Sequence, residues 1–383
     1  MAKNQKKRRR RRKKRATKIL FVLELLVLAV LIGGIFIFAQ INKKLESTQD
    51  SDFDISKVEM NEEVVQTQVA KGYQLIALVG VNPADGGLDY NNSDTMIIAC
   101  INNDTKEVSL VSLYRDTYLR IGQDEDGNGI YNKANAAYAR YGPEGMISMM
   151  NKNLDLNISD YVAIDFSALV EVVDALGGID ITLTHDEIVH MNNYCVSVSE
   201  YTGKDYEELD PDQPGTYTLN GVQATSYARI RYTAGLDFKR TQRQRLVITK
   251  IMEKAKNANL SELNDIMDAV FPMIKTSFSK ADIIKLGSSI LSYEIGETTG
   301  FPFSHYLDVV DDLDCVVPVT LEYNVKELHK LLFGEEDYQI SSELKAYNDR
   351  IVENSGYGDE YIERATAVAE ELVPDGVSEA DSM

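Results

Sequence analysis

Five short segments of the chain contain side chains suited to work on a charged substrate. They are Ser93-Asp94-Thr95, Arg115-Asp116-Thr117, Lys133-Ala134-Asn135, Tyr227-Ala228-Arg229-Ile230-Arg231, and Asp237 with Arg240 and Gln244. An arginine keeps its proton and presents a planar fork of donors that matches phosphate oxygens. The four arginines among these residues predict a site for a strongly anionic group such as a pyrophosphate. The carboxylates beside them indicate a divalent metal or a general base.

Two of these segments have a spacing that aligns their side chains. Asp237, Arg240 and Gln244 lie three and four residues apart, so a helix would place them on one face. Arg229 and Arg231 are two residues apart and would share a face if their segment were extended. The other basic residues of the predicted helix are interpreted as a solvated face with ion pairs; they are Lys239, Arg243 and Arg245.

A predicted β-hairpin would bring the first two motifs together. Residues 95–101 and 108–113 have the composition of strands, and the turn signal Asn102-Asn103-Asp104-Thr105 separates them. If the strands pair about the bond between residues 104 and 105, the numbers of paired residues sum to 209. This register places Asp94 opposite Arg115, and a slip of one residue would separate them.

Strand and helix patterns alternate along the rest of the chain. The predicted strands cover residues 74–79, 161–164, 179–183 and 315–320, and the predicted helices cover 132–140, 143–154, 166–176, 237–256, 260–274, 280–291 and 324–332. Strand, helix, Gly177-Gly178 and strand follow one another as in a βαβ unit. Residues 185–216 are rich in acids and contain two prolines, which predicts a long surface loop. The expected fold class is α/β, a single domain with a mixed central sheet covered by helices on both faces.

A basic segment followed by an apolar one begins the sequence. Twelve of the 40 Lys and Arg residues lie in residues 1–18, which contain no acid, so the other 28 face 60 acidic residues. Residues 19–39 are apolar except for Glu24 and match the roughly 20 residues that cross a bilayer as a helix. The positive-inside rule keeps the basic tail in the cytoplasm and exports the rest. The apolar stretch is longer than the core of a cleaved signal peptide, and the basic tail at its edge suits anionic lipid better than nucleic acid.

We therefore expect a single-pass membrane protein with an extracytoplasmic domain. Its regions are a cytoplasmic tail (1–18), a transmembrane helix (19–39), a stalk (40–71), a catalytic domain (72–335), a C-terminal extension (336–358) and an acidic, disordered tail (359–383). Cys100 is predicted to be buried in a strand, whereas Cys195 and Cys315 lie in polar surroundings. A disulfide between these two would persist in an exported domain, but the sequence leaves their pairing open.

Other metal and hydrolase motifs are weaker. Asp124-Glu125-Asp126-Gly127-Asn128-Gly129 matches the first half of a calcium loop, but Asn135 stands at the twelfth position, where such loops have a bidentate Glu. A glycine-rich turn between a strand and a helix explains this segment more simply. The four histidines are scattered without the spacing of a zinc hydrolase, and the sequence has no Walker loop.

The ordered set of SDT, RDT, YARIR and D-x-x-R-x-x-x-Q motifs resembles the signature of the LytR-CpsA-Psr family of cell-envelope enzymes. The resemblance runs from about residue 73 to about residue 333. It implies a phosphotransferase that moves a glycopolymer from a polyprenyl-pyrophosphate carrier onto peptidoglycan, with Mg²⁺ as cofactor. The sequence does not say which glycopolymer is moved, where the acceptor is joined or which oligomer forms.

The resemblance also assigns expected roles to single residues. Asp94 would bind the metal, and Asp94, Arg115 and Asp237 form the expected catalytic set. The pyrophosphate would be held by Arg115, Lys133, Arg229, Arg231, Arg240 and Gln244. The roles of two residues stay open at this point. Asp237 could activate the acceptor hydroxyl or orient Arg240. Lys133 could bind a phosphate or a sugar, or it could be an ordinary surface lysine.

The chain departs from the family pattern at two positions. Asn82 stands where the family usually has Asp, and Asn92 where it often has Arg. Asn82 is therefore a weak metal candidate, and Asp85 or Asp89 could replace it. These departures favour the alternative of a scaffold that binds the lipid-linked glycan without transferring it. A membrane-anchored transcriptional regulator lacks support, because the cytoplasmic tail is too short to fold.

A polyprenyl tail needs an apolar tunnel, which the family forms between its sheet and helices. The candidate lining residues, each of which could equally be ordinary core, are Met146, Ile147, Met149, Met150, Phe166, Leu169 and Val173.

Overall fold

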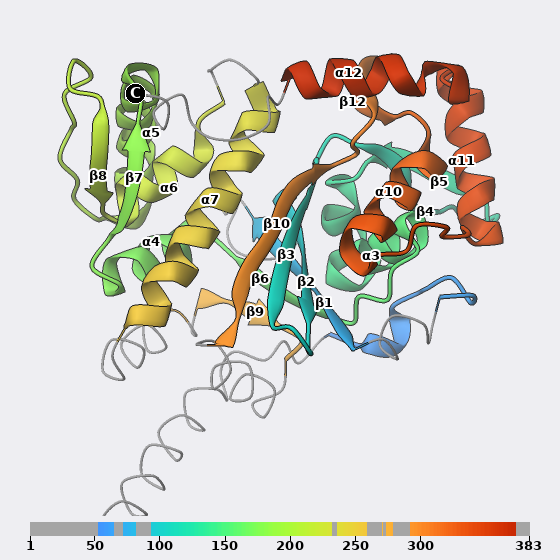
Figure 1. The fold of residues 1–383 in the computed structure, drawn as a ribbon, viewed down its shortest axis with the longest axis horizontal. Helices are drawn as coiled ribbons and strands as arrows, with labels where there is room; N and C mark the ends of the chain where they lie inside the picture. The colour runs from blue at the N-terminus through green and yellow to red at the C-terminus, as the bar shows by residue number, and fades with distance from the viewer. Residues whose placement is uncertain are drawn as a thin grey trace, which may run out of the picture. The chain divides into compact units, whose positions relative to one another are not determined.

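A mixed six-stranded sheet forms the centre of the fold (Figure 1). The structure is a computed structural model that describes residues 53–64, 72–81, 93–231, 236–258, 270, 273–278 and 292–372. The strand order is β10-β3-β2-β1-β6-β9. The strands are β1 (Tyr73–Val81), β2 (Ser93–Asn102), β3 (Glu107–Leu113), β6 (Asp160–Ile164), β9 (Lys275–Thr276) and β10 (Glu294–Phe301). β1 is parallel to β6 and β3 to β10, and the other neighbours are antiparallel, so the predicted mixed sheet is confirmed.

The β2–β3 hairpin has the predicted register. Ile97 pairs with Ser112 and Ile98 with Val111, so the numbers of each pair sum to 209. Both strands are apolar on both faces, as expected for strands covered on both sides. If one strand slipped by one residue against the other, each of its side chains would move to the opposite face of the sheet. The two faces bury different residues, so such a slip would disrupt the packing, and the register is therefore fixed.

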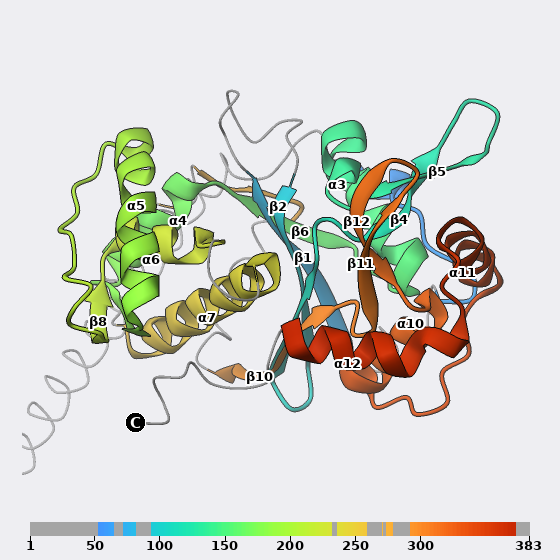
Figure 2. The same ribbon diagram turned by 90° about the horizontal axis from the view of Figure 1, so that it is seen from above.

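Helices cover both faces of the sheet, as predicted (Figure 2). On one face, helices α3 (Ala136–Leu154), α10 (Leu321–Phe333) and α11 (Ser342–Ser355) pack on the largest apolar core. On the other face, α7 (Leu236–Asn257) places Ile248 and Met252 against the sheet. The four methionine and isoleucine candidates from 146 to 150 lie in the first core, as ordinary packing residues.

A second apolar core lies beyond α7. It is built from α4 (Phe166–Ala175), β7 (Ile179–Leu183), α5 (His185–Thr202), β8 (Gly215–Leu219) and α6 (Gly221–Arg229). The predicted βαβ unit is wrong, because β7 leaves the central sheet and pairs with β8. Gly177 and Gly178 have φ values of 73° and 88°, and this left-handed turn directs the chain into the second core.

Helix α5 replaces the first part of the loop predicted for residues 185–216, whereas residues 203–214 form an irregular connection, as predicted. It begins with a capping box, in which the Thr184 side chain accepts a hydrogen bond from the backbone of Glu187 and Glu187 binds back to Thr184. Its buried residues recur at helical spacing: Ile188, Met191, Cys195 and Val198. The acidic residues around this apolar stripe made the segment resemble a loop in the sequence. The capping motif at Thr184 and Glu187 was a signal for the start of a helix.

A second hairpin follows the RDT motif. It pairs β4 (Tyr118–Gln123) with β5 (Gly129–Lys133). The calcium-like segment is therefore a turn between two strands, held by backbone N–H groups of Asp126 and Asn128 that donate to Asp124 at 3.0 and 2.7 Å. The predicted helix from residue 132 begins only at Ala136, because residues 132 and 133 complete β5. Farther along, β11 (His305–Val310) pairs with β12 (Leu313–Pro318).

Two regions expected to lack packing are part of the fold. Within the predicted stalk, η1 (Ile55–Lys57) and its flanks pack on the core through Phe53 and Val58, and Asn61 donates a hydrogen bond to Asp155 at 2.6 Å. The predicted disordered tail begins with η4 (Asp359–Tyr361) and α12 (Ile362–Leu372). Their sequences look polar because α12 buries few residues, such as Ala365, and η4 buries none.

The disulfide between Cys195 and Cys315, which the sequence left open, does not form. Cys195 is buried in the second core and Cys315 in the first, and both are free thiols. Cys100 is buried in β2, as predicted. Several predictions lie outside the described residues; they concern the transmembrane segment 19–39, Asn82, Asp85, Asp89, Asn92 and most of the helices at 260–274 and 280–291. Of the helices that the structure does describe, none combines the length and apolarity needed to cross a bilayer.

Candidate functional site

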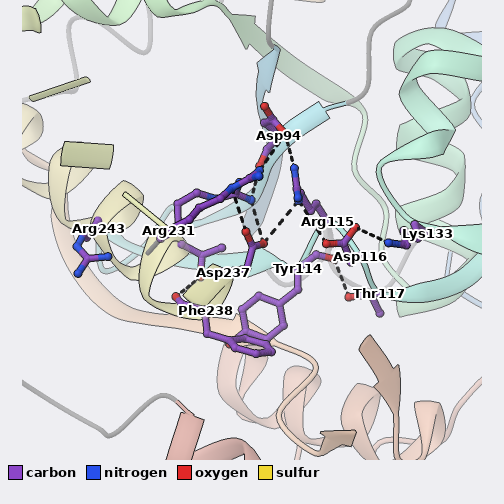
Figure 3. A network of polar contacts seen from close by, with 12 residues as sticks. Asp94, Tyr114, Arg115, Asp116, Thr117, Lys133, Arg231, Asp237, Phe238 and Arg243 are labelled. Atoms are coloured by element: carbon purple, nitrogen blue, oxygen red, sulfur yellow. Dashed lines mark hydrogen bonds and ion pairs between the residues drawn. The ribbon is translucent and has the colours of Figure 1, made fainter. Parts of the chain in front are cut away.

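The predicted register brings Asp94 and Arg115 into contact at the end of the β2–β3 hairpin (Figure 3). The Arg115 guanidinium donates to the Asp94 carboxylate, with Nη1 and Oδ1 2.6 Å apart. Both side chains are about a quarter exposed, at 21% and 27%. The hairpin therefore presents one carboxylate and one guanidinium group to solvent at the same edge of the sheet.

Asp237 organises the arginines that come from the other side. It lies in the first turn of α7, where a carboxylate is favoured by the helix dipole. Its oxygens lie 2.9 Å from Arg240 Nη2, 3.5 Å from Arg231 Nε and 3.6 Å from Arg115 Nε. Asp237 thus holds three guanidinium groups around one point.

Asp94 is bound to the same three arginines. Besides Arg115, its carboxylate lies 3.6 Å from Arg231 Nη2, and its backbone carbonyl accepts a hydrogen bond of 3.2 Å from Arg240 Nη2. Two carboxylates therefore share three positive charges, and the cluster keeps a net positive charge that suits an anion.

Burial and charge act differently on two of these arginines. Burial lowers the pKa of Arg240 to about 10, because its guanidinium is almost fully enclosed. Burial also opposes the charge of Arg115, but Asp237, Asp116 and Asp94 outweigh it and raise the pKa of Arg115. Arg240 Nε is buried without a hydrogen-bond partner among the described residues, which leaves a donor for a ligand.

Lys133 extends this cluster through Asp116. Lys133 is the last residue of β5 and pairs with Tyr118, close to the RDT motif. Its Nζ lies 3.3 Å from Asp116, whose other oxygen lies 3.4 Å from Arg115 Nε. The ion pairs therefore run without a break from Arg231 to Lys133 (Figure 3).

Arg229 does not join Arg231, so the extended geometry predicted for this segment is wrong. Helix α6 continues through Arg229, and the chain turns at Ile230. Arg229 Nη1 donates to Ser197 at 3.1 Å, and the guanidinium stacks over Phe166, 4.5 Å from the ring centroid. Burial lowers the pKa of Arg229.

An apolar cavity reaches the edge of the arginine cluster, because its lining includes Thr95, which follows Asp94, and Gln244, one helical turn after Arg240. It has a volume of about 180 Å³ and lies between the sheet and helices α4, α6 and α7. Phe166, Leu169, Arg229 and Gln244 line it, so two of the predicted tunnel residues and two of the predicted pyrophosphate ligands meet here. Val173 is buried in the second core instead.

Arg243 and Arg245 are buried, which corrects their interpretation as a solvated face. Arg243 Nε pairs with Glu187 of α5 at 3.0 Å, and its Nη1 donates to the Ile230 carbonyl at 3.3 Å. Arg245 is 4% exposed, and burial lowers its pKa to about 10. The capping box around Glu187 was the sequence signal that could have indicated the burial of Arg243, because a carboxylate at the buried start of a helix needs a basic partner.

The donor set at the cluster fits a magnesium ion bound together with a phosphate ligand. Among the described residues, no group of three or more His, Cys, Asp or Glu side chains could hold a metal by itself. Asp94 and Asp237 nevertheless face the same arginines and supply two carboxylates at one site. Mg²⁺ is commonly held by one or two carboxylates, with phosphate oxygens and water completing its shell.

The fold and the site define an α/β domain in which an arginine cluster borders an apolar cavity. The chain belongs to the LytR_cpsA_psr family, whose profile matches residues 35–316. The predicted resemblance is therefore confirmed over most of the chain.

Named relatives share the same region. The chain is 35% identical over 214 residues to the polyisoprenyl-teichoic acid–peptidoglycan teichoic acid transferase TagU of Enterococcus faecalis, covering 55% of this chain and 63% of that protein. It is 35% identical over 201 residues to biofilm regulatory protein A of Streptococcus mutans, covering 51% of this chain and 47% of that protein. The matches thus span about half of one relative and less than two thirds of the other.

Solved structures show the same fold. A structure of TagT bound to LI-WTA superposes with a TM-score of 0.56 at 23% identity and covers 75% of this chain and 100% of that one. A structure of TagT with bound octaprenyl pyrophosphate lipid gives a TM-score of 0.52 at 22% identity, with the same coverage. These similarities support the α/β fold with its mixed sheet and flanking helices.

Proposed function

We propose that this protein transfers a glycopolymer from a polyprenyl-pyrophosphate carrier to peptidoglycan. The observation that carries the proposal is the arrangement of the site. A cluster of three arginines and two carboxylates opens beside an apolar cavity, so a molecule with a pyrophosphate and a hydrocarbon tail matches both parts. The transferase names of the relatives agree with this chemistry.

The polarity of the site orients the proposed substrate. The tail would enter the cavity beside Phe166 and Leu169, and Arg229 and Gln244 would meet the first phosphate at the cavity mouth. The second, sugar-linked phosphate would lie among the three clustered arginines. The sugar would then extend toward Lys133, at the other end of the row of ion pairs.

The reaction exchanges the phosphoanhydride bond of the pyrophosphate for a phosphodiester bond to the acceptor. The acceptor hydroxyl attacks the sugar-linked phosphorus, a new P–O bond forms, and the bond to the bridging oxygen breaks so that polyprenyl phosphate leaves. Arg115, Arg231 and Arg240 stabilise the negative charge of the transition state, which is the main contribution that a protein makes to phosphoryl transfer. Asp237 is bound to all three, so it acts by positioning them.

The acceptor proton goes to a carboxylate at the cluster, and Asp94 and Asp237 would also hold Mg²⁺ when the substrate brings its phosphate oxygens. The ion would neutralise the charge of the pyrophosphate. Asn82 would contribute at most a neutral carbonyl oxygen.

The proposed location is the outer face of the cell membrane. Residues 19–39 would anchor the chain, with the basic tail in the cytoplasm and the described domain outside. A carrier lipid held in that membrane leaflet would then have its pyrophosphate within reach of the site.

A transfer assay tests the proposal directly. The full-length chain in detergent is given a labelled polyprenyl-pyrophosphate oligosaccharide and uncross-linked peptidoglycan, with Mg²⁺ or with EDTA. We expect metal-dependent transfer of label that is lost in Asp94→Ala and Arg115→Ala and kept in Arg350→Ala, an exposed arginine of α11. Lipid binding without transfer under any metal would instead establish the scaffold, with Asn82 and Asn92 as the first positions to restore.

A further inference from the structure

A second and larger cavity lies on the opposite face of the sheet from the apolar one. Its volume is about 640 Å³, and it is bordered by the η1 segment, β4, the start of α3 and β9. Tyr138 and Met149, which belong to the first core, form part of its wall. Its basic side chains come from four separate elements; they are Lys57, Arg120, Arg140, Lys152 and Lys275.

The two carboxylates of this cavity are already engaged. Glu59 pairs with Lys152 at 2.8 Å, and Glu144 accepts a hydrogen bond of 3.0 Å from the backbone N–H of Asp54. Both contacts attach the η1 segment to α3. These acids therefore build the wall of the cavity, and the ion pair of Glu59 is with Lys152.

Two arginines in the cavity have no acidic partner among the described residues. Arg120 makes contacts with neutral groups, because its Nη1 lies 3.2 Å from the Tyr347 hydroxyl and its Nη2 lies 3.3 Å from Gln123 Oε1. Arg140 is exposed and forms no ion pair within the described ranges. In a chain with 60 acidic and 40 basic residues, such a gathering of cations runs against the composition and indicates an anionic ligand.

An exposed aromatic ring stands among these cations. Tyr141 is 38% exposed and lies over two glycines. A Cβ atom at Gly122 would lie 2.8 Å from the Tyr141 ring, and one at Gly145 would lie 2.1 Å from Tyr141 Cβ. The ring thus occupies its place because both neighbours lack side chains.

We propose that this cavity is a second binding site for an anionic saccharide. The C–H groups of a sugar ring pack against the electron-rich face of an aromatic ring, and the surrounding Lys and Arg side chains pair with carboxylate or phosphate substituents. Tyr141 supplies the first kind of contact, and Arg120 and Arg140 supply the second. Such a ligand could come from the polymer on the carrier, which offers phosphodiesters, or from the wall, which offers carboxylates.

Binding to this site does not require transfer chemistry, so it can be measured separately. The full-length chain in detergent is titrated into three fluorescently labelled probes: hexagalacturonate, hexa(glycerol phosphate) and neutral chitohexaose. We expect the two anionic probes to bind, more weakly as salt is raised, and chitohexaose not to bind in the same range. Stronger binding of the phosphodiester probe would favour the carrier polymer, and stronger binding of the uronate probe would favour the wall.

Matched variants distinguish binding of the anionic probes in the cavity from nonspecific attraction to positive charges elsewhere on the surface. The double variant Lys57→Gln, Arg140→Gln should weaken both anionic probes about tenfold, whereas Lys330→Gln, Lys345→Gln, which removes two exposed charges from α10 and α11, should change them less than twofold. Tyr141→Ala should weaken only hexagalacturonate, because glycerol phosphate has no sugar ring. Equal losses in the two double variants, or equal binding of chitohexaose, would refute the proposal.

Arg115→Ala keeps the two hypotheses distinct. It should abolish transfer and leave the affinity for both anionic probes unchanged, because Arg115 contacts the carboxylates of the transfer site and does not line the second cavity. Loss of probe binding in Arg115→Ala would place the anion at the transfer site and overturn the second site, with the transferase proposal unaffected.

Discussion

Asp237 carries more of the site than its single charge suggests. Its two oxygens are shared by Arg115, Arg231 and Arg240, which come from the turn after β3, the α6–α7 connection and α7 itself. Both oxygens of Asp237 are therefore already engaged by guanidinium groups. Of the two roles that the sequence left open, we propose the orientation of the arginines rather than activation of the acceptor hydroxyl.

Replacing Asp237 with Asn tests this role. The amide can hold at most part of the arginine network, so we expect kcat for transfer to fall about 100-fold through misplacement of the arginines. The pH dependence of kcat should keep its shape, since the group that accepts the proton is still present. Steady-state transfer rates measured across pH 5 to 9 check both statements.

A double-variant comparison makes the Asp237 test sharper. Arg240→Ala should lose activity to a similar degree, and combining it with Asp237→Asn should cost little more, because the two residues act as one unit. Disappearance of the acid limb of the pH–rate profile in Asp237→Asn would instead identify Asp237 as the general base.

Spacing along the sequence predicted the contact across the hairpin correctly and failed where a helix ended. The partner sum of 209 placed Asp94 against Arg115, because hairpin register follows from the turn. Arg229 and Arg231 were placed on one face by assuming an extended segment, but α6 ends between them. The stop is set by tertiary packing around Ile230, which is fully buried and which no local pattern identifies.

At the scale of elements, the buried pair of Glu187 and Arg243 joins α5 to α7. The side chain of Glu187 is 11% exposed and that of Arg243 is 7% exposed, and Arg243 also binds the Ile230 carbonyl next to Arg231. Glu187→Ala would leave Arg243 as an uncompensated buried charge, so we expect a loss of about 3 kcal/mol in the free energy of unfolding. Urea unfolding followed by circular dichroism measures this loss.

The chain offers a matched control for the Glu187 variant. Glu253 pairs with Lys250 at the same distance of 3.0 Å on the exposed side of α7, so Glu253→Ala should change the free energy of unfolding by less than about 0.5 kcal/mol. The apolar double variant Glu187→Leu, Arg243→Met should recover the part of the loss that comes from the unpaired charge, but not the part that comes from the lost contact of Glu187 with Thr184. If Glu187→Ala were as mild as Glu253→Ala, the pair would contribute little to stability.

Gly221 lets α4 and α6 approach each other beside the apolar cavity. A Cβ atom at this position would lie 2.3 Å from the Val170 carbonyl oxygen and 2.8 Å from Val170 Cα. Because backbone atoms cannot move aside, Gly221→Ala should separate the helices, cost about 2 kcal/mol in the free energy of unfolding and weaken binding of a polyprenyl pyrophosphate. Thermal unfolding and lipid titration measure the two effects.

Gly215→Ala is the control for Gly221→Ala. It adds the same methyl group where no atom lies within 4 Å, so stability and lipid affinity should stay close to those of the unchanged protein. A loss of stability without a loss of lipid affinity in Gly221→Ala would show that the cavity does not depend on this helix contact.

The edge strands β9 and β10 of the central sheet were not predicted, but its four inner strands, β3, β2, β1 and β6, were predictable because they are apolar and bounded by turn signals. The second core was not, for two physical reasons. Helix α5 has a narrow apolar stripe within a polar and acidic sequence. The strand β7 has the composition of any half-buried strand, so only its pairing with β8, a tertiary fact, shows that it leaves the central sheet.

At the scale of the whole molecule, the site lies where two apolar cores meet. The first core fixes β2 and β3, which present Asp94 and Arg115, and the second fixes α6, which leads to Arg231. A small aromatic cluster of Tyr114 and Phe238 lies directly beside these residues and includes His305. Conditions that loosen this cluster should therefore affect stability and activity together.

His305 makes the whole protein sensitive to acid. Its ring is buried, stacks on Phe238 with 4.9 Å between centroids, and its Nδ1 lies 2.9 Å from the Pro302 carbonyl oxygen. Burial lowers the pKa of His305 from the ordinary 6.5 to about 4. Above pH 6.5 the ring is neutral in both the folded and the unfolded chain, so its full contribution to stability is present there.

Between pH 6.5 and pH 4 the unfolded chain binds a proton at His305 that the folded chain refuses. We expect this one group to remove about 3 kcal/mol from the free energy of unfolding across that range, with no further loss from it below pH 4. Urea unfolding at pH 7.5, 6, 5 and 4 measures the slope. In His305→Phe the free energy of unfolding should fall by about 3 kcal/mol less between pH 6.5 and pH 4. The variant should keep some acid sensitivity, because burial also lowers the pKa of His329. An unchanged slope in His305→Phe would mean that the ring is already solvated in the folded protein and that the aromatic cluster does not couple acid to the site.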